Sequence, residues 1–166
     1  MKVLLPIDGS AAALAAVHHA LRCAQAGLAC SYVLLNVQDP ASLYELVVTH
    51  DTEALTALRR EAGSELLAPA EALLEAAGAD YESEVAGGEP ATLLVELLEN
   101  YGCEAVVMGA IGMGRMGSMG SMGGGDDTGL GSVALALLHH SPVPVTVVRV
   151  AATEADAAGE MQGALG

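Results

Sequence analysis

KVLLPIDGS, residues 2–10, decides the fold that we expect. The apolar run over residues 2–7 is typical of a buried strand, and Asp8-Gly9 predicts a turn directly after it. Ser10 is a favoured residue at a helix N-cap, so we expect a helix from there to about Ala26. A strand that leads through a tight turn into a helix is the repeating unit of an α/β protein.

The same alternation of short apolar strands and helices continues to residue 150. Such an alternation predicts a single α/β domain, with five parallel strands in one sheet and helices on both faces. Acids alternate along 81–85, which is typical of an edge strand, whereas the apolar run 105–108 is expected inside the sheet. The expected strands are 2–7, 31–37, 81–85, 105–108 and 143–150, and the expected helices are 10–26, 52–77, 90–100 and 132–140. The second helix should bury Leu55, Leu58, Ala62, Leu66 and Leu73.

The composition excludes several classes of function. A net charge of −15 with only 6 lysines and arginines provides no basic surface, so we expect neither nucleic acid nor a membrane as a partner. No apolar run approaches the length of a transmembrane helix, and no signal segment is evident at the start. The 3 cysteines lack CxxC spacing and fit a reduced, cytoplasmic protein. Residues 151–166 are acidic and are expected to form a flexible tail.

Glycine is concentrated in one segment, because ten of the 20 glycines lie between Gly109 and Gly131. Gly109-Ala110-Ile111-Gly112 follows the fourth expected strand, and Gly131-Ser132-Val133 begins the next helix. Backbone N–H groups of a glycine-rich loop and of a helix N-terminus bind anions, so this segment predicts a phosphate site without lysine. Ligands of parallel sheets bind at the carboxyl ends of the strands, where Asp8 can accept a ribose hydroxyl or hold Mg²⁺ beside phosphates.

Three segments of the chain resemble the universal stress protein (UspA) family, in its nucleotide-binding branch. They are Val3–Ser10, Val106–Gly109 and Gly131–Val145, and the resemblance extends over residues 1–150. It implies a Rossmann-like fold of the adenine nucleotide alpha hydrolase type and a cytoplasmic stress-response protein that binds ATP or AMP with Mg²⁺. It also implies a homodimer through the strand at 143–150. The residues expected around the nucleotide are Pro6, Ile7, Asp8, Val37, Met108, Gly109, Gly112, Gly131, Ser132 and Val133.

The nucleotide-binding signature of that family, Gly-x2-Gly-x9-Gly-Ser/Thr, is matched at both ends but not in its spacing. Eighteen residues, 113–130, lie between Gly112 and Gly131. Residues 113–128 form a low-complexity Gly/Met insertion, which either bulges into solvent or disrupts the phosphate cradle. In the second case the alternative function is a nucleotide-free dimeric module that docks protein partners.

Three further patterns in the sequence carry weaker alternatives. Methionine at every third position of 113–122 either supplies thioether ligands for Cu(I) or belongs to a flexible repeat. Ser10 either caps its helix or contacts phosphate. No general base, catalytic lysine or arginine finger is evident beside the expected phosphates, so we expect at most slow ATP hydrolysis. An enzyme that acts on an adenylated substrate is a third function, by analogy of fold alone.

Overall fold

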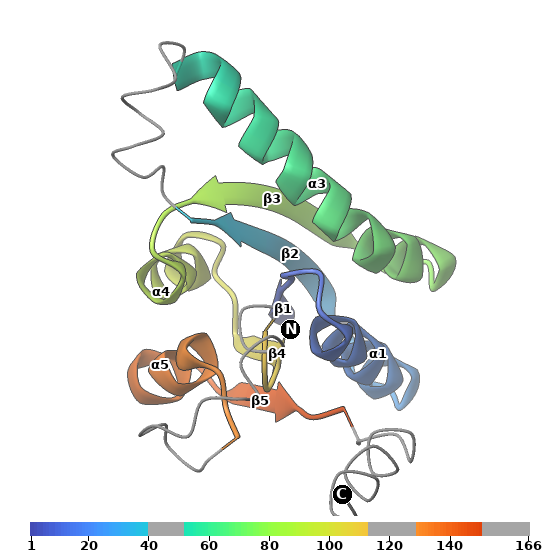
Figure 1. Cartoon of the computed structure of the whole chain (residues 1–166). Coiled ribbons are helices and arrows are strands. Elements are labelled where there is room, and N and C mark those ends of the chain that lie inside the picture. The colour runs from blue at the N-terminus through green and yellow to red at the C-terminus, as the bar shows by residue number, and fades with distance from the viewer. Residues whose placement is uncertain (40–51, 113–128, 151–166) are drawn as a thin grey trace, which may run out of the picture.

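The computed structural model describes residues 1–39, 52–112 and 129–150, which form one five-stranded parallel sheet with helices packed on it (Figure 1). The expected alternation of strands and helices is confirmed in every described element. In chain order the elements are β1 (Lys2–Pro6), α1 (Ala11–Gln25), β2 (Ser31–Gln38), α3 (Thr52–Ala76), β3 (Tyr81–Gly87), α4 (Pro90–Asn100), β4 (Ala105–Gly109), α5 (Ser132–His140) and β5 (Val145–Val148). The expected insertion at 113–128, with its methionine repeat, and the expected tail at 151–166 lie outside the described residues.

The strands follow the order β3-β2-β1-β4-β5, and every neighbouring pair is parallel. β3 lies at one edge and β4 inside the sheet, as their acidic and apolar sequences predict. β5 forms the other edge but is shorter than the expected strand at 143–150. It begins after Pro144, which has no N–H group for pairing. The chain changes direction across the sheet between β1 and β4, and ligands of α/β proteins bind at such a switch point.

Two hydrophobic cores lie on opposite faces of the sheet. Val3 and Leu5 of β1 belong to the core under α1 and α3, whereas Leu4 between them belongs to the core under α4 and α5 (Figure 1). The same alternation continues through β2 and β4, because successive side chains of a strand point to opposite faces. The expected helices on both faces are therefore confirmed.

α3 is rotated from the orientation that its leucine pattern predicts, although Leu73 still packs against the core as a partly buried residue. Its buried residues are Gly63, Leu67, Ala70 and Leu74, while Leu58 is 62% exposed. A Cβ atom at Gly63 would lie 2.9 Å from Asn36 Oδ1 and would also collide with the Val85 side chain. Close contact between helix and sheet at this glycine sets the rotation of α3. No described helix, α3 included, has the length and apolar character that crossing a bilayer requires.

Candidate functional site

A cavity of about 530 Å³ opens at the carboxyl ends of β1, β2 and β4. It lies next to the switch point of the sheet and is bordered by the first residues of α4 and α5. All ten residues that the sequence predicts around a nucleotide line this one cavity. They are Pro6, Ile7, Asp8, Val37, Met108, Gly109, Gly112, Gly131, Ser132 and Val133.

The two halves of the glycine signature meet at this cavity. The Gly131 N–H donates a hydrogen bond of 2.7 Å to the carbonyl oxygen of Ala110. A Cβ atom on Gly131 would lie 3.5 Å from that oxygen and 3.7 Å from the Gly112 nitrogen. The ends of the long connection are therefore adjacent, although eighteen residues separate them in the sequence. This adjacency favours the interpretation in which extra residues extend the loop while its ends keep their places.

Asp8 is directed toward the glycine loop by the turn that follows β1. One carboxylate oxygen of Asp8 accepts the Ser10 N–H at 3.0 Å, and Gly9 between them has a φ of +81°. The other oxygen, Oδ2, occupies the position that a side chain on Gly112 would need. Glycine at 112 therefore lets the loop after β4 lie directly against the Asp8 carboxylate.

Helices α4 and α5 present different N-termini to the cavity. The Glu89 carboxylate caps α4 and accepts the N–H groups of Ala91 at 3.2 Å and Thr92 at 2.8 Å. These hydrogen bonds, the one from Thr92 first, lower the pKa of Glu89 and keep it charged. α5 follows Gly131, an N-cap residue that has no side chain with which to cap the first amide groups. Of these two helix N-termini, the one at α5 is thus suited to an anionic ligand.

Ser10 serves as the cap of α1, one of the two roles that its position allows. Its Oγ accepts the Ala13 N–H at 3.1 Å, and the residue is 2% exposed. Gly109 allows this helix to lie against the end of β4, because a Cβ there would be 2.7 Å from the Ala12 carbonyl carbon. The first turn of α1 is thereby fixed beside the cavity.

Sequence reasoning missed Asn36, which fixes the end of β1. This buried amide donates to the Ile7 carbonyl oxygen at 2.7 Å and accepts from Gln38 Nε2 at 2.6 Å. One amide within an otherwise apolar strand is a sequence signal for such a contact. Asp39 and Glu89 also line the cavity and were not predicted to do so.

The described residues contain no cluster of three histidine, cysteine or acidic side chains that could hold a metal ion. Among these residues, Asp8, the predicted Mg²⁺ ligand, therefore offers one carboxylate beside the glycine loop and is not part of a cluster of protein ligands. Magnesium that arrives with a nucleotide is held by one or two carboxylates together with phosphate oxygens. The position of Asp8 fits that arrangement, in which most of the ligands come from the nucleotide and water.

The chain matches known proteins over nearly its whole length. Residues 1–149 match the model of the universal stress protein family. Universal stress protein MJ0531 of Methanocaldococcus jannaschii is 30% identical over 148 residues, which cover 89% of this chain and 81% of that protein. A solved universal stress protein in complex with cAMP has 22% identity and a TM-score of 0.62, with 89% of this chain and 96% of the other covered. An Arabidopsis thaliana family member with AMP bound has 18% identity and a TM-score of 0.60, with 92% and 93% covered. The chain belongs to the universal stress protein family.

Proposed function

We propose that this protein binds an adenine nucleotide, ATP or AMP, in the cavity at the carboxyl ends of the strands. The adenine base would lie against Pro6, Ile7 and Val37, and the ribose beside Asp8. The phosphates would contact the backbone amides that follow Gly131. Magnesium, where the nucleotide carries it, would be held by Asp8 and phosphate oxygens.

The observation that supports this proposal most strongly is the N-terminus of α5, which has a glycine as its N-cap and lies beside the paired glycines. Backbone N–H groups and the helix dipole together attract phosphate without any lysine. The solved relatives that carry cAMP and AMP lend support, because they share the fold of this chain.

We propose that nucleotide occupancy regulates a cytoplasmic stress-response protein. Among the described residues that line the cavity there is no lysine, arginine or histidine. Phosphoryl transfer depends on such groups to position and stabilise the transferred phosphate, so at most slow hydrolysis is expected. The cytoplasmic location remains a prediction from the cysteine content.

The Ser132→Asp variant tests the proposed phosphate position. A carboxylate at the first residue of α5 would compete with phosphate for the helix N-terminus, so we expect affinity to fall at least about tenfold. A thermal-shift titration with ATP and Mg²⁺ measures this, because a ligand that binds only the native state raises Tm. Ser64→Asp, an exposed position on α3, is the matched control and should keep the shift. If Ser132→Asp binds ATP as tightly as the wild type, the proposed phosphate position is contradicted. If ATP does not raise the Tm of the wild type, the alternative of a nucleotide-free dimeric module that docks protein partners is favoured.

A homodimer through β5 is the second part of the proposal. β5 is an edge strand with valines at three of its four positions, and such an edge can pair with a second copy. The Pro144 carbonyl accepts from Val106 of β4 and the Val148 carbonyl from Ala110 directly after β4, so the amide of Val147 is directed outward. Val147→Pro should shift sedimentation from dimer to monomer, and a wild-type monomer at all concentrations would contradict this part.

A further inference from the structure

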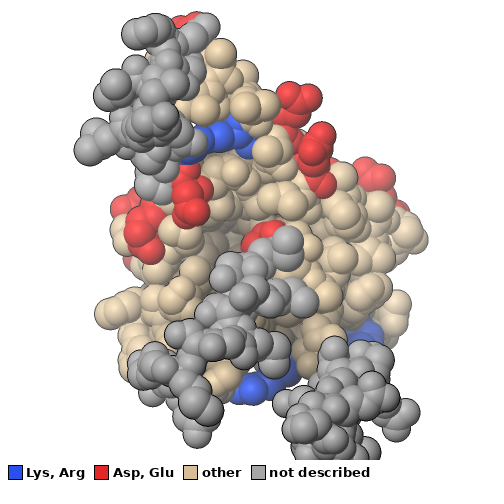
Figure 2. All heavy atoms as spheres, viewed as in Figure 1, with Lys and Arg blue, Asp and Glu red and all other residues tan. Residues whose placement is uncertain are grey.

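Carboxylates, rather than basic groups, line the cavity. Asp8, Asp39 and Glu89 are its charged lining residues among the described part of the chain. Arg59 of α3 donates to the Asp39 carbonyl oxygen, and the guanidinium of Arg149 lies against Gly129, but neither arginine is part of the lining. Figure 2 shows acidic side chains near the middle of this face, with basic ones above and below them. The described lining of the cavity therefore carries net negative charge.

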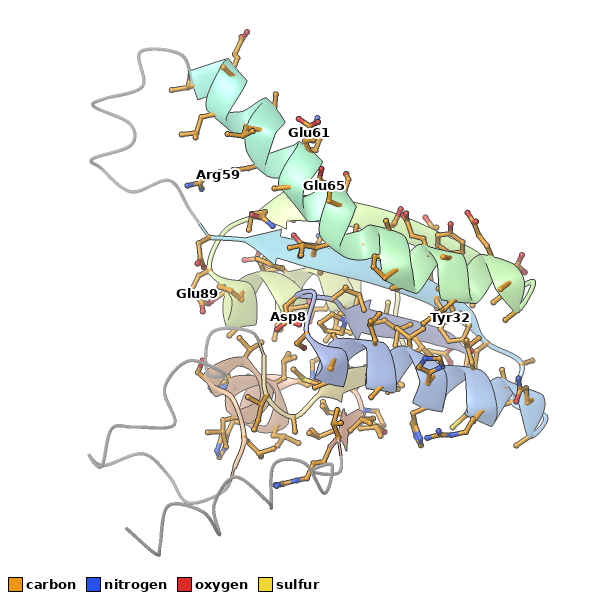
Figure 3. The ribbon with its side chains drawn as sticks, turned by 45° about the vertical axis from the view of Figure 1, so that its right-hand side comes forward. Asp8, Tyr32, Arg59, Glu61, Glu65 and Glu89 are labelled. Carbon is orange, nitrogen blue, oxygen red and sulfur yellow. The ribbon has the colours of Figure 1, made fainter. Side chains whose placement is uncertain are left out.

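Glu89 is an exposed carboxylate that the backbone of α4 holds in place. Its two oxygens accept the amides of Ala91 and Thr92, so the charge is held at the start of α4. Figure 3 shows Asp8 and Glu89 at the same end of the sheet, at the beginning of α1 and of α4. The protein thus caps the N-terminus of α4 with its own anion, whereas the N-cap residue of α5 is a glycine.

This arrangement limits how much phosphate charge the cavity accepts. The α5 amides compensate one phosphate group, whereas further phosphates add charge to a cavity whose described charged residues are all acidic. The N-termini of α1 and α4 beside it are already capped, by Ser10 and Glu89. A divalent cation that neutralises the polyphosphate removes this repulsion. A monophosphate needs no such compensation.

We propose that Glu89 acts as a charge filter, through which the cavity prefers a nucleoside monophosphate to a triphosphate free of divalent cation. The triphosphate enters as its magnesium complex. This inference rests on the proposed nucleotide site and adds the residue that sets its specificity.

The variant Glu89→Gln tests the filter, because it removes the charge while its single amide oxygen can still accept one of the two backbone N–H groups. Calorimetric titrations with AMP and with ATP, each in EDTA and in Mg²⁺, yield the ratio of the two Kd values. In EDTA the wild type should bind AMP about tenfold or more tightly than ATP, and Glu89→Gln should narrow that ratio about fivefold. Magnesium should also reduce the difference between the AMP and ATP affinities of the wild type.

Two further variants keep the test decisive. Glu89→Asp retains the charge and a favoured capping residue, so it should keep the wild-type ratio. Glu96→Gln makes the same charge change at an exposed position of α4 that does not line the cavity, and it should also keep the ratio. Urea midpoints of all variants verify folding.

The outcomes separate this inference from the proposed function. Tighter binding of ATP than of AMP in EDTA, or an equal ratio in wild type and Glu89→Gln, would overturn the charge filter while leaving the nucleotide site intact. Absence of binding by either nucleotide in every condition would instead overturn the proposed function.

Discussion

Asp8 and Gly112 come from loops far apart in the sequence, and their contact depends on a missing side chain. The Asp8 carboxylate occupies the space beside Gly112 that a Cβ atom would take. The predicted ribose or metal contact and the predicted phosphate loop therefore depend on each other. A side chain at position 112 would therefore displace the Asp8 carboxylate.

Gly112→Ala tests this dependence. The added methyl group must push the Asp8 carboxylate away, so we expect nucleotide affinity to fall about fivefold or more, a loss of about 1 kcal/mol. Calorimetric titration with AMP measures the change. Gly87→Ala is the matched control, because a Cβ there meets nothing within 4 Å. Equal affinities of the two variants would mean that Asp8 does not contact the ligand.

Among single residues, the sequence predicted those that belong to a known binding motif. The glycines and Ser132 fit an anion-binding motif, Asp8 was predicted to contact ribose or Mg²⁺, and the structure brings them to one cavity. Glu89 was missed, because Ser, Thr, Asp and Asn are the usual capping residues and glutamate in a helical region is read as a solvent-exposed charge. Asp39 was missed because its contribution depends on where β2 ends.

Among the elements, α3 shows where a hydrophobic pattern fails. Leucines at helical spacing predicted a buried face that includes Leu58, whereas the helix packs through Gly63 and Leu67. The pattern counts apolar side chains and gives no weight to a glycine, yet close approach at Gly63 decides the rotation. Strands were predicted more accurately, because a short run buried on both faces is apolar throughout.

A pair of leucine substitutions distinguishes the observed face from the predicted one. Leu67→Ala removes a side chain that is 2% exposed and should lower the free energy of unfolding by about 2–5 kcal/mol. Leu58→Ala, at a residue 62% exposed, should change it by at most about 0.5 kcal/mol. Urea denaturation measures both. The reverse order would mean that α3 packs through the face that the leucine pattern predicts.

For the whole molecule, the alternation of strands and helices was sufficient to predict a parallel α/β sheet. The order of the strands was not predicted, because local periodicity contains no information on which strands pair. Only that order, with β1 beside β4, brings Asp8 next to the glycine loop.

Two tyrosines give the whole molecule a dependence on alkaline pH. Burial, followed by the neighbouring Cys30, raises the pKa of Tyr32 from 10.0 to about 12, and the hydrogen bond to Glu84 raises the pKa of Tyr101 to about 12. Between pH 10 and 12 the unfolded chain loses these protons while the native protein retains them. The contribution of these two tyrosines to stability should therefore be constant below about pH 9 and fall as the pH rises through this range.

Urea midpoints at pH 8, 10 and 11 measure this loss. Tyr101→Phe should make the decline shallower, since one of the two groups no longer titrates. A wild-type midpoint that stays constant to pH 11 would contradict the raised pKa values.

The central claim is that a nucleotide phosphate binds at the N-terminus of α5 and not at that of α4. A ¹⁵N–¹H NMR titration with AMP tests it most directly, because each backbone amide reports its own hydrogen bonding. We predict that the amide signals of Ser132, Val133 and Ala134 move on binding, while those of Ala91 and Thr92, already bonded to Glu89, stay in place. Signals of the α5 amides that remain unchanged at millimolar AMP would contradict the account.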